Sequence, residues 1–260
     1  MNSMRIPFAG ALLVFGLASR GGAAAGDASP PPVLVFAATG VSGVLERIGK
    51  AFTEKTGAPV QVSSGGSAAL SDKIVKGAPA DLLVSAGPGP IALLIQYGLA
   101  DEGSAFAWAT NRLVVVTSAE HALSLSSLDE LASAGVHHLV IGNPASAVAG
   151  SYAQRALMTL GLWAKLKEKV ILAPDIPSAL DDVESGKADF GIVYASDARL
   201  ASRIKVVMTI PERTHDPIQY PAARVAHSGA SPAAAPFIDF LRGPEAKRIL
   251  EDAGFTPSFP

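Results

Sequence analysis

The stretch VLVFAATGVSG at residues 33–43 carries the signals that decide the fold class. Its first six residues form a continuous apolar run, which is typical of a buried strand in a parallel sheet. Small residues follow, and apolar residues then recur at helical spacing: Val44, Ile48 and Phe52. A strand that passes through small residues into a helix points free backbone N–H groups at one place, where the helix dipole favours an anion. A plain helix cap at Thr39 or Ser42 explains this stretch equally well.

The alternation of strands and helices continues along the first part of the chain. Further strands are predicted at 59–64 and 81–86, and further helices at 68–76 and 91–97. This β-α-β-α-β-α order is the pattern of a doubly wound α/β layer.

A second α/β set begins at Leu113, with no clear helical crossover before it. Its predicted strands are 113–116, 136–141, 170–172 and 190–194, and its predicted helices are 128–134, 151–166 and 178–184. Ser127 and Glu130 have the spacing of a capping box. The last predicted elements are a long strand at 204–210 that could lead back to the first lobe, a strand at 219–225, and helices at 236–241 and 245–253.

We therefore predict an α/β fold of two doubly wound lobes joined by crossing strands. Lobe 1 would contain residues 26–110 and 209–260, and lobe 2 residues 111–208. Folds of this kind bind ligands in clefts between lobes and at the carboxyl ends of strands.

The N-terminus has the pattern of a secretory signal peptide. Arg5 precedes an apolar segment at 8–18, and Ala23-Ala24-Ala25 forms an A-x-A cleavage signal. We expect residues 1–25 to be removed, so that the exported protein starts at Gly26 and is not inserted in a membrane. Export without an anchor indicates the periplasm.

Composition excludes several classes of protein. With 49% hydrophobic and 17% charged residues the chain is globular rather than disordered. The formal net charge is −2, and removing the two arginines of residues 1–25 takes it to −4, which argues against nucleic-acid binding. The absence of Cys excludes disulfides, thiolate metal sites and a lipid-modified cysteine.

No motif indicates a cofactor, a metal ion or a catalytic centre. GPGPIA at 87–92 fits a dinucleotide pattern, but Pro88 and Pro90 remove backbone donors that a pyrophosphate would need. His137 and His138 are adjacent and would face opposite sides of a strand, so they do not form a chelating pair. No G-x-S-x-G elbow occurs, which disfavours a hydrolase.

Four predicted strand-to-helix junctions share small or apolar residues and lack Lys and Arg: 39–42, 65–68, 148–151 and 175–178. Each has an ordinary explanation, such as a cap at Ser67 or Asp175 or a tight turn at Ala149-Gly150. Together they predict a site that binds an anion with neutral donors only.

The chain resembles the periplasmic molybdate-binding proteins of ABC importers, within the type II periplasmic binding fold. The resemblance runs from about Val33 to Phe255. It is carried by the following stretches: VFAA at 35–38, GAPADLLVSA at 77–86, GNP at 142–144 with Ala149-Gly150 and Tyr152, GIVYASDA at 191–198, and GPEA at 243–246.

The resemblance implies an oxyanion site in which Ser67 gives hydroxyl and backbone donors, Ala149 and Ile176 give backbone N–H groups, and Tyr194 gives its hydroxyl. The first loop departs from the family, because many members have serine where this chain has Gly40. Others have threonine one residue earlier, so the first hydroxyl is expected from Thr39, with the Gly40 N–H and with Ser42 as the fallback.

The function implied is capture of a tetrahedral oxyanion, molybdate or tungstate, by a monomer that delivers it to the membrane permease and ATPase of an ABC importer. No enzyme activity, cofactor or direct cation ligand is expected. The alternatives are a binding protein for another oxyanion or small organic anion, or an exported enzyme that uses the same cleft. Asp175 is the single general base that the four junctions offer.

Overall fold

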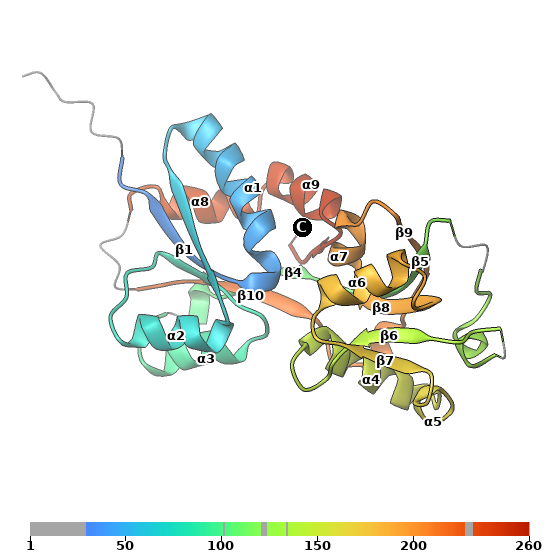
Figure 1. Cartoon of the computed structure of the whole chain (residues 1–260). Coiled ribbons are helices and arrows are strands. Elements are labelled where there is room, and N and C mark those ends of the chain that lie inside the picture. Colours follow the sequence, from blue (N-terminus) through green and yellow to red (C-terminus); the bar gives the residue numbers. More distant parts are fainter. Residues whose placement is uncertain (1–29, 101, 121–123, 134, 227–230, 260) are drawn as a thin grey trace, which may run out of the picture.

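The computed structural model describes residues 30–100, 102–120, 124–133, 135–226 and 231–259. The predicted signal segment 1–25 lies outside the described residues. Two α/β lobes lie side by side, each built on one sheet with helices on both faces (Figure 1). In the described part of the chain, no helix combines the length and the apolar character that crossing a membrane requires.

The first sheet has the strand order β11-β4-β10-β3-β1-β2. Three strands are parallel to each other: β1 (Val33–Ala38), β2 (Val60–Gly65) and β3 (Leu82–Val84). Antiparallel pairing continues the sheet through β10 (Gln219–Arg224), β4 (Phe106–Thr110) and β11 (Thr256–Pro257). Its helices are α1 (Thr39–Thr56), α2 (Ser67–Val75), α3 (Gly89–Gln96), α8 (Ala234–Leu241) and α9 (Pro244–Asp252), with a 3₁₀ turn at Glu102–Ser104.

The second sheet has the order β7-β6-β8-β5-β9. Its strands are β5 (Leu113–Ser118), β6 (Leu139–Gly142), β7 (Val170–Ala173), β8 (Phe190–Tyr194) and β9 (Ile204–Thr209). Its helices are α4 (Val148–Thr159), α5 (Trp163–Leu166), α6 (Ile176–Glu184) and α7 (Ala195–Leu200), with 3₁₀ turns η2 (Leu128–Ala132) and η3 (Glu212–Thr214).

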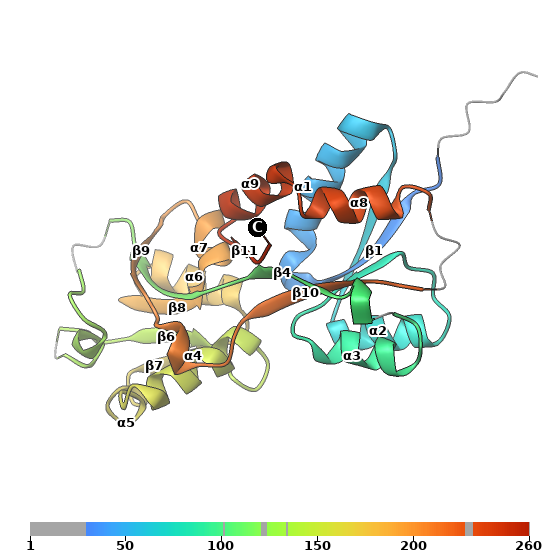
Figure 2. The ribbon, with the colours of Figure 1, turned by 180° about the vertical axis from the view of Figure 1, so that it is seen from behind.

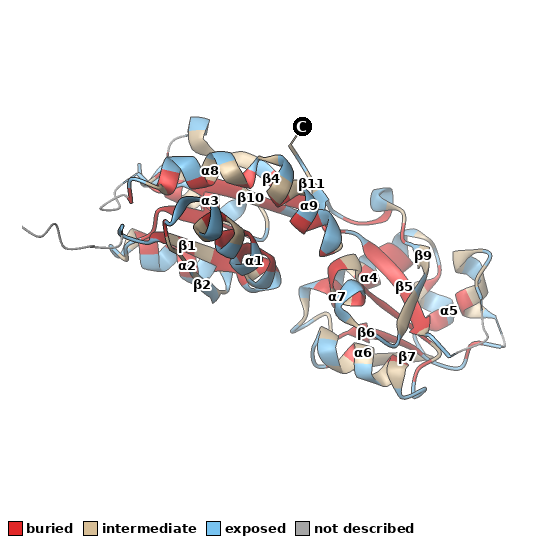
Figure 3. Ribbon diagram, turned by 90° about the horizontal axis from the view of Figure 1, so that it is seen from above, coloured by how far each residue is buried: buried red, intermediate tan, exposed pale blue. Residues whose placement is uncertain are grey.

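Alternating side chains of the central strands feed separate apolar layers, as strand geometry requires. Val33 and Val35 of β1 pack in the same cluster as α1, α8 and α9, whereas Phe36 packs with α2 and α3 on the other face. In the second sheet Val115 faces the side of α4, and Val114 faces the side of α6 and α7. The buried positions, red in Figure 3, therefore follow the sheets of both lobes.

Two crossing segments join the sheets, and they are hydrogen-bonded to each other. Residues 111–112 lead from β4 to β5, and residues 210–218 lead from β9 back to β10 (Figure 2). The Asn111 N–H donates to the carbonyl oxygen of Ile218 at 3.0 Å, and the Ile210 N–H donates to that of Leu113 at 2.9 Å. The fold class predicted from the sequence is confirmed.

Several predicted elements need correction. The predicted strand at 204–210 is β9, which belongs to the second sheet because it pairs with β5, and the segment that follows it leads back to the first sheet as expected. The 151–166 helix is two helices, since Gly161 adopts a left-handed conformation with φ 72° and ends α4. The capping box also fails: Ser127 makes no side-chain cap bond, and Glu130 Oε2 instead accepts from the Ser126 N–H at 3.1 Å.

Candidate functional site

The helices that start the predicted junctions begin at the carboxyl ends of their strands. Thr39 opens α1 directly after the last residue of β1, and only Gly66 separates β2 from α2. In the second lobe α4 starts six residues after β6, and α6 starts three residues after β7. Parallel strands bring these helix starts to one edge of each sheet.

Three of these helices start without a side-chain cap. The N-cap residues of α1, α2 and α4 are Ala38, Gly66 and Ala147, and none of them makes a side-chain hydrogen bond to the helix. The first N–H groups of a helix have no partner within it, so uncapped starts leave donors for a ligand.

Serine hydroxyls near these starts do not occupy the free N–H groups. Each donates instead to the carbonyl oxygen three residues earlier: Ser42 to Thr39 at 3.0 Å, Ser71 to Ala68 at 2.9 Å and Ser151 to Val148 at 2.8 Å. The Ser42 hydroxyl is therefore engaged within α1.

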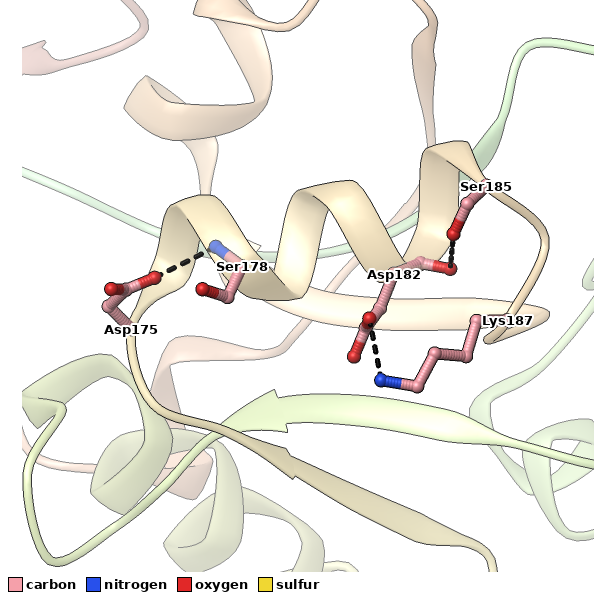
Figure 4. A network of polar contacts seen from close by, with 5 residues as sticks. All are labelled: Asp175, Ser178, Asp182, Ser185 and Lys187. Atoms are coloured by element: carbon pink, nitrogen blue, oxygen red, sulfur yellow. Dashed lines mark hydrogen bonds and ion pairs between the residues drawn. The ribbon is translucent and has the colours of Figure 1, made fainter.

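The start of α6 differs because Asp175 caps it. Its carboxylate accepts from the Ser178 N–H at 2.8 Å (Figure 4), as the sequence predicted. Hydrogen bonds from the side chain and backbone of Ser178 lower the pKa of Asp175 below its usual value. This carboxylate is fully explained as a cap.

The predicted site residues are only partly brought together. Thr39 and Gly40 are exposed and line a cavity of about 450 Å³ with Asp197 of α7. Ile176 lines a cavity of about 280 Å³ that also reaches Asp197. Ser67, Ala149 and Tyr194 line neither of these two cavities.

A cation also borders the first cavity, which the junction residues alone did not indicate. Arg47, in the third turn of α1, lines it together with Asp197. The four junctions themselves carry no Lys or Arg, but the wider cavity is bordered by the positive charge of this side chain.

Ser67 is not the helix cap that the sequence also allowed. It is the first residue of α2, and its hydroxyl oxygen accepts from the Ala86 N–H at 2.9 Å. A hydroxyl that accepts one bond keeps its own proton for donation.

A group of tyrosines stands near the lobe junction. Burial raises the pKa of Tyr194, with further contributions from Tyr220, Tyr152 and Asp197. Burial also raises the pKa of Tyr220 to about 12, although a hydrogen bond from Asn111 opposes the shift. These phenols remain protonated at neutral pH and can act as neutral donors.

Asp197 is the titratable carboxyl within this group. Burial raises its pKa to about 6, so a substantial fraction is protonated in mildly acidic solution. In the described part of the chain no three His, Cys, Asp or Glu side chains come together as a metal site.

The sequence did not single out Tyr220, Asn111 or Asp197 as functional residues. Tyr220 lies 180 positions from Gly40 in the chain, and no local pattern reveals such a contact. Asp197 stands within the GIVYASDA stretch, just after the end of β8, which was the available signal.

Comparison with known proteins places this architecture in a family. The family described as "Bacterial extracellular solute-binding protein" matches residues 33–256. The chain belongs to this family. The molybdate-binding protein ModA of Escherichia coli is 36% identical and the match covers 96% of each chain. ModA of Haemophilus influenzae is 31% identical over 88% of this chain and 91% of that protein.

Solved structures agree with this membership. A substrate-binding domain from Clostridium difficile has a TM-score of 0.81 at 32% identity, covering 85% of this chain and 96% of that one. The periplasmic molybdate-binding protein of Azotobacter vinelandii has a TM-score of 0.67 at 31% identity, covering 85% and 97%. The sulfate-binding protein SubI of Mycobacterium tuberculosis, at 22% identity and a TM-score of 0.65, shares the fold.

Proposed function

We propose that this family member captures a tetrahedral oxyanion, molybdate or tungstate, between its lobes and delivers it to an ABC importer. The observation that carries the proposal is the set of uncapped helix starts at α1, α2 and α4, with the hydroxyl of Tyr220 near the first of them. A dianion with four oxygens can accept several hydrogen bonds from such N–H and O–H donors. The ModA relatives are named for molybdate binding, which supports this class of ligand.

The site would use Thr39, Gly40 and Ser67 from one lobe, and Ala149, Ile176 and Tyr194 from the other. We propose residues 26–110 with 209–260, and residues 111–208, as the two units that close on the ligand. Thr39 and Gly40 line one cavity and Ile176 another, and closure of the lobes would bring these donors and the remaining three to one point.

Discrimination against sulfate would come from cavity size, because sulfate has the same charge and shape. Hydrogen-bond donors alone would bind either ion, so the distances between the helix starts would set the preference for molybdate over sulfate. The remaining parts of the proposal are export after cleavage at Ala25, a periplasmic location, a monomer, and contact with a membrane permease and its ATPase. An enzyme is not favoured, because Asp175 is occupied as a cap.

Isothermal calorimetry of the dialysed protein tests the proposal. Molybdate and tungstate should bind stoichiometrically, and sulfate and phosphate should bind at least a hundredfold more weakly. Sulfate or phosphate binding as tight as molybdate would assign a different oxyanion, and absence of binding to all four would reject an oxyanion site.

A further inference from the structure

The space that Gly40 leaves empty is bordered by the hydroxyl of a distant residue. A Cβ atom placed on Gly40 would lie 3.6 Å from the Tyr220 Oη. Apart from its chain neighbours and its own helix, no other described heavy atom comes within 4 Å of that position. The phenol of β10 therefore faces the first turn of α1, where the backbone donors lack a side-chain cap.

The Asn111 side chain neighbours the Tyr220 hydroxyl, since its interaction with the phenol lowers the pKa of Tyr220. The Asn111 Oδ1 accepts from the Arg112 N–H at 2.9 Å, which identifies the other end of the carboxamide as its NH₂ group. That NH₂ group donates to the Ser196 Oγ at 2.8 Å. An amide lowers the pKa of a phenol by acting as a donor towards its oxygen, so the Tyr220 proton is left for another acceptor.

The Tyr220 side chain is held in place for such a role. It is 5% exposed, and its ring meets Phe255 edge-on with 5.7 Å between centroids. Burial keeps the hydroxyl protonated, because it raises its pKa to about 12. A fixed, protonated phenol with an unused proton is a preorganised donor for an anion.

We propose that the Tyr220 hydroxyl donates a hydrogen bond to the bound oxyanion, in the space that a side chain at residue 40 would otherwise fill. This inference rests on the proposed oxyanion function and adds a donor from a crossing strand to those of the helix starts. Because Gly40 has no side chain, a ligand oxygen can approach the phenol directly.

Calorimetric titration with molybdate tests the role of the hydroxyl. Tyr220→Phe keeps the ring and removes the donor, and should weaken binding by about tenfold or more. Tyr97→Phe is the matched control, because Tyr97 is 59% exposed at the end of α3, and it should bind as the parent does. Equal binding by the parent and a folded Tyr220→Phe variant would overturn the inference.

Substitutions at Gly40 give a second test that does not depend on the folding of Tyr220→Phe. Gly40→Ala would place a methyl group between the phenol and the anion, whereas Gly40→Ser would place a hydroxyl there that can donate in its stead. The serine variant should therefore bind molybdate at least tenfold more tightly than the alanine variant. Equal affinities of these two variants would contradict the inference.

The double variant Gly40→Ser with Tyr220→Phe tests whether Tyr220 contacts the anion in the space beside Gly40. In the Gly40→Ser background, Tyr220→Phe should cost about threefold or less, because the serine hydroxyl takes over the contact. The same loss in both backgrounds would overturn the inference, since Tyr220 would then act elsewhere. A parent protein that does not bind molybdate would reject the proposed function itself, and this inference with it.

Discussion

The carbonyl oxygen of Gly142 occupies the position where a side chain on Gly150 would begin. The first turn of α4 therefore presses directly on the end of β6, and residue 150 must lack a Cβ atom. This contact sets the position of the neighbouring Ala149 N–H, one of the proposed donors. Close packing of this kind leaves no room for relaxation, because both partners are backbone.

Gly150→Ala should lower the free energy of unfolding by about 3 kcal/mol or more, as overpacking against backbone does. Denaturant unfolding measures this loss. Gly89→Ala is the control: Gly89 opens α3, and a Cβ atom added there would meet no described heavy atom within 4 Å. That control should change stability by less than about 1 kcal/mol. Equal stability of the two variants would show that α4 can move away from β6.

Thr39→Val should weaken molybdate binding by about tenfold to a hundredfold, because it removes a hydroxyl donor to a charged ligand worth about 1.5–3 kcal/mol. Ser42→Ala should cost much less, since that hydroxyl already donates to the Thr39 carbonyl oxygen. Titration of both variants in one buffer makes the comparison. A strong effect of Ser42→Ala with a silent Thr39→Val would move the first hydroxyl to Ser42.

Asp197 should make the stability of the protein depend on pH. Its pKa is about 6 when folded, against an ordinary value of 3.8, so its ionised form is disfavoured by burial. Its contribution to stability is complete below pH 3.8 and is lost as the pH rises through about 6. The polar groups around it are Tyr194 and Tyr220, with further groups lining the same cavities: Arg47, Asp181 and Glu184.

Asp197→Asn removes the free-energy cost of burying an ionised carboxylate at this position. At pH 8 the variant should be more stable than the parent by up to about 3 kcal/mol, and at about pH 4 it should show no such gain. Unfolding curves at the two pH values measure the difference. A gain that is the same at both would mean that the carboxyl is not the titrating group.

Ligand should draw the lobes together, because donors from both would bind one ion. Small-angle scattering should give a smaller radius of gyration with molybdate than without. The Arg199 Nε donates to the carbonyl oxygen of Asp252 at 3.3 Å, which joins α7 to the end of α9. We expect these two segments to stay in contact when the lobes close. An unchanged radius at saturating molybdate would argue against hinge closure.

Local patterns were sufficient to predict much of the fold. The apolar run of β1 and the helical spacing after it indicated the first unit, and the place of Asp175 before Pro177 indicated a cap. Gly161 is the local signal for the end of α4, and the predicted helix at 151–166 runs through it in error.

Other features had no local signal. The strand β4 contains small residues at Ala107 and Ala109, and α7 follows β8 without a turn residue, so neither was predicted. The contact between Gly40 and Tyr220 depends on the tertiary fold, since β10 returns from the second sheet to lie beside β3. Sequence patterns report neighbours along the chain, whereas this part of the site is assembled from distant segments.

The position of the bound ion tests most directly whether an oxyanion binds between the two lobes. Crystals grown with molybdate, measured with X-rays near the molybdenum absorption edge, would locate the metal by its anomalous signal. We expect one strong peak between the lobes, within hydrogen-bonding reach of Thr39 and Tyr194 through the oxyanion oxygens. A peak elsewhere, or no peak at a concentration that saturates the protein in calorimetry, would contradict it.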